Sequence, residues 1–330
     1  MATTAPLLDV QDLHVQFATR AGVAKAVNGV SFSVQPGRCL AVLGESGSGK
    51  SVTAQAIMGI IDEPVGSITG GRILYRGNDL LTLPEKERVQ VRGAEVALIF
   101  QDALSALNSV YPVGRQISEA YRVRNGVSRQ DAHKRALELM DLVRIPDAAA
   151  RVTQYPHQFS GGMRQRIMIA MALALEPKML IADEPTTALD VTVQAEIMEL
   201  LAEIRAERNM AMMLITHDLG VVAENADDVV VMYAGRTVES GNVFDLFASP
   251  KHPYTRGLLA SMPDIDLVSQ NLNAIPGAPP PLTDLPTGCS FHPRCPLATE
   301  ICRVQRPELL QVGSRSSACH HSDLLEGALR

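Results

Sequence analysis

The sequence predicts an α/β fold with a mainly parallel sheet. Five short apolar runs bounded by Gly, Pro or Asp have the character of strands that are buried on both faces. These runs are residues 39–43, 96–100, 179–182, 212–216 and 229–233. Between them lie helical patterns, such as 131–144 and 191–208, in which apolar residues recur every three and four positions. Strands that alternate with helices are typical of an α/β domain.

Three further parts complete the expected architecture. Apolar and polar residues alternate in two stretches near the start, which predicts an antiparallel β layer against the main sheet. The apolar members are Leu13, Val15, Phe17, Val30, Phe32 and Val34. Residues 102–170 carry helical patterns without a strand, which predicts a helical subdomain. Because the later sequence is rich in proline and turns, we expect one domain over 1–250 and a C-terminal extension over 251–330.

Composition limits the classes of function. The 330 residues are 46% hydrophobic and 20% charged, which is enough to bury a core. A formal charge of −6 and the absence of Trp argue against a nucleic-acid partner or a polybasic membrane contact. No apolar run approaches the roughly 18 residues of a membrane span, and no secretory signal is evident. We therefore expect a cytosolic protein that needs separate partners for any membrane role.

Residues 44–51, here called the phosphate loop, read GESGSGKS and match G-x-x-x-x-G-K-[ST] between an apolar strand and a helical pattern. Gly47 and Gly49 would let backbone N–H groups converge on phosphate oxygens. Lys50 would reach the β- and γ-phosphates, and the Ser51 hydroxyl would bind Mg²⁺. The alternative is a simple glycine turn. The expected ATP-binding residues here are Gly44, Glu45, Ser46, Gly47, Ser48, Gly49, Lys50, Ser51 and Val52.

Two carboxylates follow a later buried strand. Residues 179–184 read MLIADE. Asp183 is expected to orient Mg²⁺, directly or through water, and Glu184 to act as general base for the attacking water. An Asp-Glu pair alone is more often a solvated strand end, but its combination with the phosphate loop favours the functional interpretation.

A third motif narrows the class of ATPase. Residues 159–166 read FSGGMRQR before a helical pattern, so a Ser-Gly-Gly turn lies at a helix N-terminus, where anions bind. The stretch resembles the signature motif L-S-G-G-Q of the ATP-binding-cassette (ABC) family, with Phe159 in place of Leu and Met163 in place of Gln. The residues of this signature turn are Ser160, Gly161, Gly162 and Met163.

The remaining marks follow in the family's order. Gln101 and His217 each follow a predicted strand, and Asp190 ends an Ala-Leu-Asp motif, the D-loop. The resemblance implies a P-loop NTPase core, in which ATP and Mg²⁺ lie between the phosphate loop of one domain and the signature turn of another. It also implies that Gln101 touches Mg²⁺ and the attacking water and that His217 contacts the γ-phosphate. Phe17 would stack on adenine, with core packing as the alternative.

The resemblance extends to the dipeptide and oligopeptide importer ATPases, through residues 157–197 and the run SPKHPYTRGLLASMP at 249–263. It implies an ATP-hydrolysing subunit at the cytoplasmic face of the cell membrane that powers peptide import. The implied partners are a second, non-identical ATPase subunit, two transmembrane permease subunits and an extracytoplasmic solute-binding protein. Nickel or another small solute is an alternative cargo. A soluble ABC ATPase acting on DNA or ribosomes is a further alternative, disfavoured because its usual insertions are missing.

Four of the five cysteines lie in the C-terminal extension with the spacing C-x5-C-x6-C-x16-C. Four thiolates could close a metal site. As in some peptide-importer ATPases, we expect Cys289, Cys295, Cys302 and Cys319 to hold a [4Fe-4S] cluster. Structural zinc and unligated thiols are the alternatives.

Overall fold

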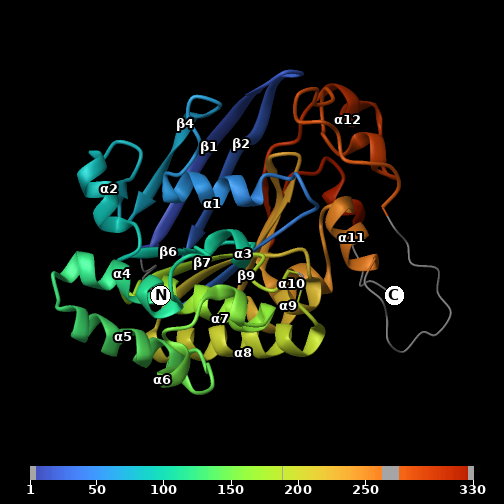
Figure 1. The fold of residues 1–330 in the computed structure, drawn as a ribbon. Coiled ribbons are helices and arrows are strands. Elements are labelled where there is room, and N and C mark those ends of the chain that lie inside the picture. The colour runs from blue at the N-terminus through green and yellow to red at the C-terminus, as the bar shows by residue number, and fades with distance from the viewer. Residues whose placement is uncertain (1–4, 188, 262–274, 326–330) are drawn as a thin grey trace. The chain divides into compact units, whose positions relative to one another are not determined.

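The computed structural model describes residues 5–187, 189–261 and 275–325. The chain divides into two compact units. Figure 1 labels the helices and strands of both. Unit 1 comprises Met1–Thr82 and Ile215–Arg330, and unit 2 comprises Leu83–Leu214. The two units are defined by how compactly each part of the chain packs, and unit 2 includes strands as well as helices. This division therefore does not test the predicted domain boundaries, which stay a prediction.

An antiparallel sheet opens unit 1, in the strand order β2-β1-β4-β5. Its strands are β1 (Leu8–Thr19), β2 (Gly22–Val34), β4 (Gly66–Tyr75) and β5 (Asn78–Asp79). Leu13 pairs with Val30 and Val10 with Phe32, and all four side chains are buried. The alternating pattern therefore places one face of this layer in the core, as the sequence predicts.

A second run of strands in unit 1 has the order β11-β12-β10-β9-β3. Its strands are β3 (Cys39–Leu43), β9 (Asp228–Tyr233), β10 (Arg236–Asn242), β11 (Leu310–Val312) and β12 (Arg315–Ser317). The fully buried β3 pairs in parallel with β9, whereas β10 and β12 pair antiparallel. The C-terminal extension thus contributes two strands, β11 and β12, to the sheet that contains β3.

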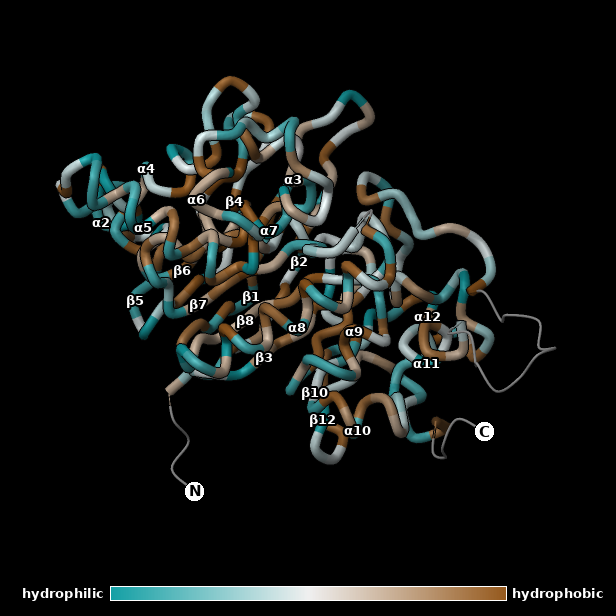
Figure 2. The backbone as a smooth tube through the Cα atoms, turned by 60° about the horizontal axis from the view of Figure 1, so that its bottom comes forward, coloured by the Kyte–Doolittle hydropathy of each residue, from teal (hydrophilic) through white to brown (hydrophobic). Residues whose placement is uncertain are grey.

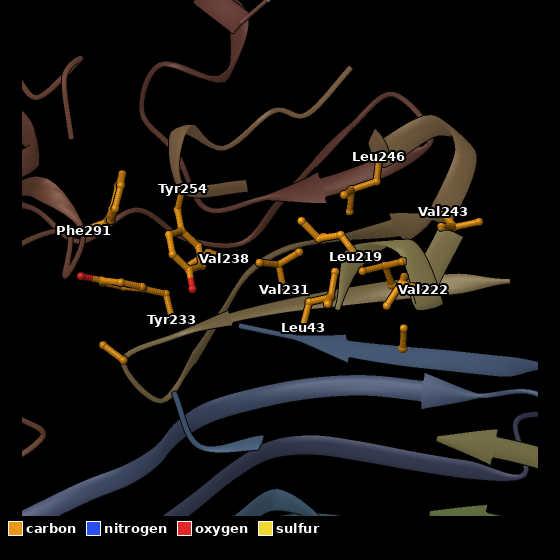
Figure 3. Packing of buried hydrophobic residues seen from close by; sticks show 13 residues of the cluster. Leu43, Leu219, Val222, Val231, Tyr233, Val238, Val243, Leu246, Tyr254 and Phe291 are labelled. Carbon is orange, nitrogen blue, oxygen red and sulfur yellow. The ribbon is translucent and has the colours of Figure 1, made fainter. Parts of the chain in front are cut away.

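Unit 1 contains several helices, and one apolar cluster of this unit is shared by β3, β9 and the C-terminal extension (Figure 3). The helices are α1 (Lys50–Met58), α9 (Leu219–Asn225), α10 (Val243–Ala248), α11 (Pro253–Ala260), α12 (Glu300–Val304) and the 3-10 turns η2 (His292–Arg294) and η3 (Ser322–Leu325). Leu43, Tyr233, Tyr254 and Phe291 are all buried in this cluster. The extension therefore shares its core with the strand that precedes the phosphate loop.

Unit 2 combines helices with three buried strands in the order β8-β7-β6. The strands are β6 (Val96–Ile99), β7 (Met179–Asp183) and β8 (Ala211–Ile215), and their tubes are brown in Figure 2. The helices are α2 (Glu85–Val91), α3 (Ala103–Ala106), α4 (Val113–Asn125), α5 (Arg129–Leu142), α6 (Ala148–Arg151), α7 (Gly161–Ala172), α8 (Val191–Arg208) and the turn η1 (Pro156–Gln158). β6 and β7 pair in parallel. Among the residues that the structure describes, none of the helices has the length and apolar character that crossing a membrane requires.

Candidate functional site

The phosphate loop of unit 1 joins β3 to α1 and lies tightly against neighbouring backbone. Gly44 and Gly49 have φ angles of 152° and 102°. A Cβ atom at Gly44 would lie 2.2 Å from the carbonyl oxygen of Met232, and one at Gly49 would lie 2.3 Å from that of Ala26. Both positions therefore require glycine, on steric as well as conformational grounds.

Lys50 opens α1 and lies across the phosphate loop. Its side chain is buried, and its Nζ donates hydrogen bonds to the carbonyl oxygens of Gly44 at 2.7 Å and Glu45 at 3.1 Å. The hydroxyl of Thr53 donates to the carbonyl oxygen of Gly49 at 2.9 Å. These bonds hold the only cation of the loop motif next to the loop backbone, where phosphate oxygens are expected.

The other expected nucleotide contacts in unit 1 differ in exposure. Ser46 and Gly47 are exposed, Ser51 and Val52 are half-buried, and Ser48 is buried. The Ser48 hydroxyl has no hydrogen-bond partner among the described residues. The half-buried Phe17 packs against Gly66, where a Cβ atom would lie 2.7 Å from its ring.

His217 lies in the turn between β8 and α9, in unit 1. The preceding residue, Thr216, donates its backbone N–H to the carbonyl oxygen of Val42 in β3 at 3.3 Å. Asp218 caps α9 by accepting from the N–H of Gly220 at 2.9 Å. These contacts on either side fix the exposed His217 close to the end of β3 from which the phosphate loop leaves.

Unit 2 brings Gln101 and Glu184 together. Glu184 follows the buried Asp183 at the end of β7 and has a φ of 48°, which non-glycine residues rarely adopt. One carboxylate oxygen of Glu184 accepts hydrogen bonds from Gln101 Nε2 at 3.0 Å and from Thr187 Oγ1 at 2.8 Å. Sequence reasoning missed Thr187, although a hydroxyl three residues after an expected base is a recognisable signal. The structure thus supplies two donors that orient this carboxylate.

The signature turn lies at the start of α7. Ser160 is the N-cap residue, and its hydroxyl accepts from the N–H of Met163 at 3.4 Å. Ser160 and Gly161 are exposed, whereas Phe159 is buried and so fills the apolar role of the Leu in the family motif. A Cβ atom at Gly162 would lie 2.6 Å from Val193 Cγ1, so this glycine allows α7 to approach α8.

The D-loop residue Asp190 caps α8, because its side chain accepts from the N–H of Val193 at 3.0 Å. Ala188, at the start of the same motif, lies outside the described residues. The neighbouring Val191 is 83% exposed. Leu189 lies beside Gly161, with its Cδ2 3.7 Å from a Cβ built there. The signature turn and the D-loop therefore form one exposed region of unit 2.

The predicted [4Fe-4S] site is not formed. Within residues 5–187, 189–261 and 275–325 there is no group of three or more His, Cys, Asp or Glu side chains that could hold a metal ion. The prediction that Cys289, Cys295, Cys302 and Cys319 bind an iron–sulfur cluster is therefore wrong. The same finding gives the zinc alternative no support.

The physical reason lies in the surroundings of the thiols. Burial raises the pKa of Cys289, Cys295 and Cys319, to about 11 for Cys319, which disfavours the thiolate form at neutral pH. Metal ligation requires thiolates. Cys302 lies 3.7 Å from the hydroxyl of Thr299, and the Cys319 sulfur accepts from a backbone N–H at 3.3 Å. The extension packs into the apolar cluster of unit 1 through Phe291 and Tyr254, and Cys289 and Cys295 pack against that cluster as apolar side chains.

Comparison with known protein families gives matches along most of the chain. The family model described as ABC transporter matches residues 27–187, and the one described as oligopeptide/dipeptide transporter, C-terminal region, matches residues 238–302. The dipeptide transport ATP-binding protein DppD of Haemophilus influenzae is 51% identical, over 95% of this chain and 95% of its own length. The protein of that name from Escherichia coli is 49% identical, over 96% of each chain.

Solved structures show the same fold. The dimeric ATP-binding cassette MJ0796, in a post-hydrolysis state bound to ADP and Pi, matches with a TM-score of 0.64 at 24% identity, over 72% of this chain and 98% of its own. CbiO1 from Clostridium perfringens, part of the ABC transporter complex cbiONQ, matches with a TM-score of 0.63 at 30% identity, over 74% and 91%. These likenesses confirm the predicted fold class.

Proposed function

The chain belongs to the ATP-binding proteins of oligopeptide and dipeptide ABC transporters, and from this premise we propose that it hydrolyses ATP to power the import of peptides through a membrane permease pair. The observation that carries the proposal is the identity of 51% over 95% of the chain with a dipeptide transport ATP-binding protein. The match of residues 238–302 to the transporter C-terminal region supports it independently of the ATPase motifs.

The phosphate loop fits the triphosphate of ATP and its Mg²⁺ ion. The fit rests on the close-packed glycines, on the buried Lys50 ammonium, and on the Ser51 hydroxyl in the first turn of α1. In this role Lys50 exchanges its bonds to loop carbonyls for phosphate oxygens. Bound Mg²⁺ would neutralise phosphate charge, with the Ser51 hydroxyl as its ligand in unit 1. The family resemblance, and no geometry, implies Gln101 and Asp183 as its other ligands. Phe17 would stack on the adenine.

Glu184 is the proposed general base for the attacking water. Hydrogen bonds from Gln101 and Thr187 to one oxygen of its carboxylate fix the direction in which the other oxygen points. A base held in this way loses little orientational freedom in the transition state. His217 is proposed to contact the γ-phosphate.

A second ATPase subunit is proposed to complete each nucleotide site. Ser160, Gly161, Gly162 and Met163 would meet the nucleotide held by the partner, with Asp190 beside them. The support is that the signature turn and the D-loop form one exposed region, in which Val191 is 83% exposed. An exposed apolar residue beside an anion-binding turn is suited to a subunit interface.

The remaining partners follow from the family. We propose association with two transmembrane permease subunits at the cytoplasmic face of the cell membrane, with a non-identical second ATPase and an extracytoplasmic solute-binding protein. We also propose residues 1–250 as the nucleotide-binding domain, with a helical subdomain at about 102–170, and 251–330 as the extension. Part of the extension, 262–274 and 326–330, lies outside the described residues.

The proposed function is tested with the chain assembled with its permease and solute-binding partners in liposomes. Hydrolysis of ATP is measured with a dipeptide, with a longer peptide, and with nickel salt as candidate cargo. Stimulation by peptide together with peptide accumulation supports the proposal. Stimulation by nickel alone would establish the alternative cargo, and a chain that associates with nucleic acid and with no permease would establish the soluble alternative.

A further inference from the structure

The C-terminal extension reaches the phosphate loop through an ion pair. Arg294, in η2, donates from Nη1 to Glu45 Oε2 at 2.6 Å and from Nη2 to Glu45 Oε1 at 3.0 Å. Glu45 is the second residue of the phosphate loop. A bidentate Arg–carboxylate pair of this kind fixes the orientation of the carboxylate and also neutralises its charge. The loop is therefore bound to a segment 249 residues away along the chain.

The arginine is itself held rigidly. Its side chain is 5% exposed, and its Nε donates to the carbonyl oxygen of Pro276 at 2.9 Å. The guanidinium carbon lies 5.8 Å from the ring centre of Tyr233 and 6.0 Å from that of Phe291, which are neighbours in Figure 3. The hydrogen bond to Glu45 raises the pKa of Arg294 above its ordinary value, so the guanidinium is charged at every physiological pH.

The extension also holds the backbone of Glu45. The hydroxyl of Tyr254, in α11, accepts a hydrogen bond from the N–H of Glu45 at 2.9 Å. Tyr254 is fully buried, and its ring lies 4.7 Å from that of Tyr233. Backbone and carboxylate of this loop residue are therefore both bound by residues of the C-terminal extension.

A carboxylate in a loop that binds phosphate is electrostatically unfavourable. Like charges repel over several ångströms, and more strongly where water is partly excluded. Glu45 is half-buried, so solvent screens its charge incompletely. An uncompensated carboxylate at this position would weaken the binding of a polyanion, and the loop needs a fixed cation beside it.

We infer that Arg294 is a positioning residue of the nucleotide site: it draws the Glu45 carboxylate aside and neutralises it, so that the extension prepares the phosphate loop for ATP. This inference rests on the proposed function. It assigns the extension a role in ATP binding that neither the ATPase motifs nor a metal site would give it.

The test is equilibrium binding of Mg²⁺-ATP to the full chain, compared among Arg294→Met, Glu45→Gln, the double variant and Arg294→Lys. Arg38→Met is the matched control, because Arg38 makes an ion pair with Asp228 at 2.9 Å at the opposite end of β3. Thermal unfolding of each variant shows whether it is folded. Arg294→Lys keeps the positive charge but cannot form the bidentate hydrogen bonds of the guanidinium. It provides the test if Arg294→Met does not fold.

We expect Arg294→Met to weaken ATP binding about tenfold, Arg294→Lys to weaken it less, and Arg38→Met to leave it unchanged. Glu45→Gln removes the negative charge and leaves the Arg294 cation beside the loop, so it should bind ATP more tightly than the wild type. Adding it to Arg294→Met should restore most of the lost affinity. A double variant as weak as Arg294→Met, or an Arg294→Met chain with wild-type affinity, would overturn the inference. Absence of ATP binding by the wild type would instead overturn the proposed function.

Discussion

Acid should loosen the attachment of the C-terminal extension through His252. This side chain is fully buried and caps α11, because its Nδ1 accepts from the N–H of Tyr254 at 3.1 Å. Its ring lies 5.8 Å from that of Phe291. Burial lowers the pKa of His252 to about 3, so the folded protein keeps this imidazole neutral.

The size of the effect follows from the two pKa values. In the unfolded chain His252 has a pKa of about 6.5. Between about pH 6.5 and 3 its imidazole is therefore protonated in the unfolded chain and neutral in the folded protein. A depressed pKa gives stability that is present above pH 6.5 and is lost as the pH falls. At about 1.4 kcal/mol per pH unit, the free energy of unfolding should fall by about 2 kcal/mol between pH 7.5 and pH 5.

The assay is urea unfolding of wild type and His252→Asn at both pH values. Asn can accept the same backbone N–H and does not titrate, so it is a matched control. Other groups titrate too, among them the buried Glu239, whose pKa is raised by burial and which accepts from the N–H of His252. The difference between the two proteins isolates His252. If both lose the same stability between these pH values, the reasoning is refuted.

Two further predictions concern packing in unit 1. Phe291→Ala should lower the free energy of unfolding by about 3–5 kcal/mol, because the ring is 2% exposed and packs among three other rings. Urea unfolding measures this free energy, and a loss below about 1 kcal/mol would contradict the packing. Gly49→Ala should remove measurable ATP binding, since its Cβ would lie 2.3 Å from the Ala26 carbonyl oxygen, whereas Gly70→Ala, where the nearest atom is 3.5 Å away, should bind normally.

The strands of the core were predictable because each is a short apolar run with a clear end. The run 39–43 forms β3 with those bounds, and the helical pattern at 191–208 forms α8. The phosphate loop follows from local spacing alone, since its chemistry lies within eight consecutive residues. Local patterns of this kind need no knowledge of distant contacts.

The contacts of the C-terminal extension could not be predicted in this way. The pair of Arg294 with Glu45 joins residues 249 positions apart, and no periodicity marks either of them. The cysteine spacing suggested a metal site, yet spacing along a proline-rich segment does not determine where thiols point. The proposed need for a metal also overlooked Phe291 and Tyr254, two aromatic residues that anchor the extension in the core.

The central claim is that this chain hydrolyses ATP with Glu184 as base in order to move peptide. The most direct measurement is peptide-stimulated ATP hydrolysis by the assembled transporter carrying Glu184→Gln. The control is Glu199→Gln, because the side chain of Glu199 is 66% exposed on α8. We predict that Glu184→Gln still binds ATP but lowers hydrolysis at least about a hundredfold and stops peptide uptake, while the control keeps wild-type rates. Wild-type turnover in the Glu184→Gln transporter would contradict the claim.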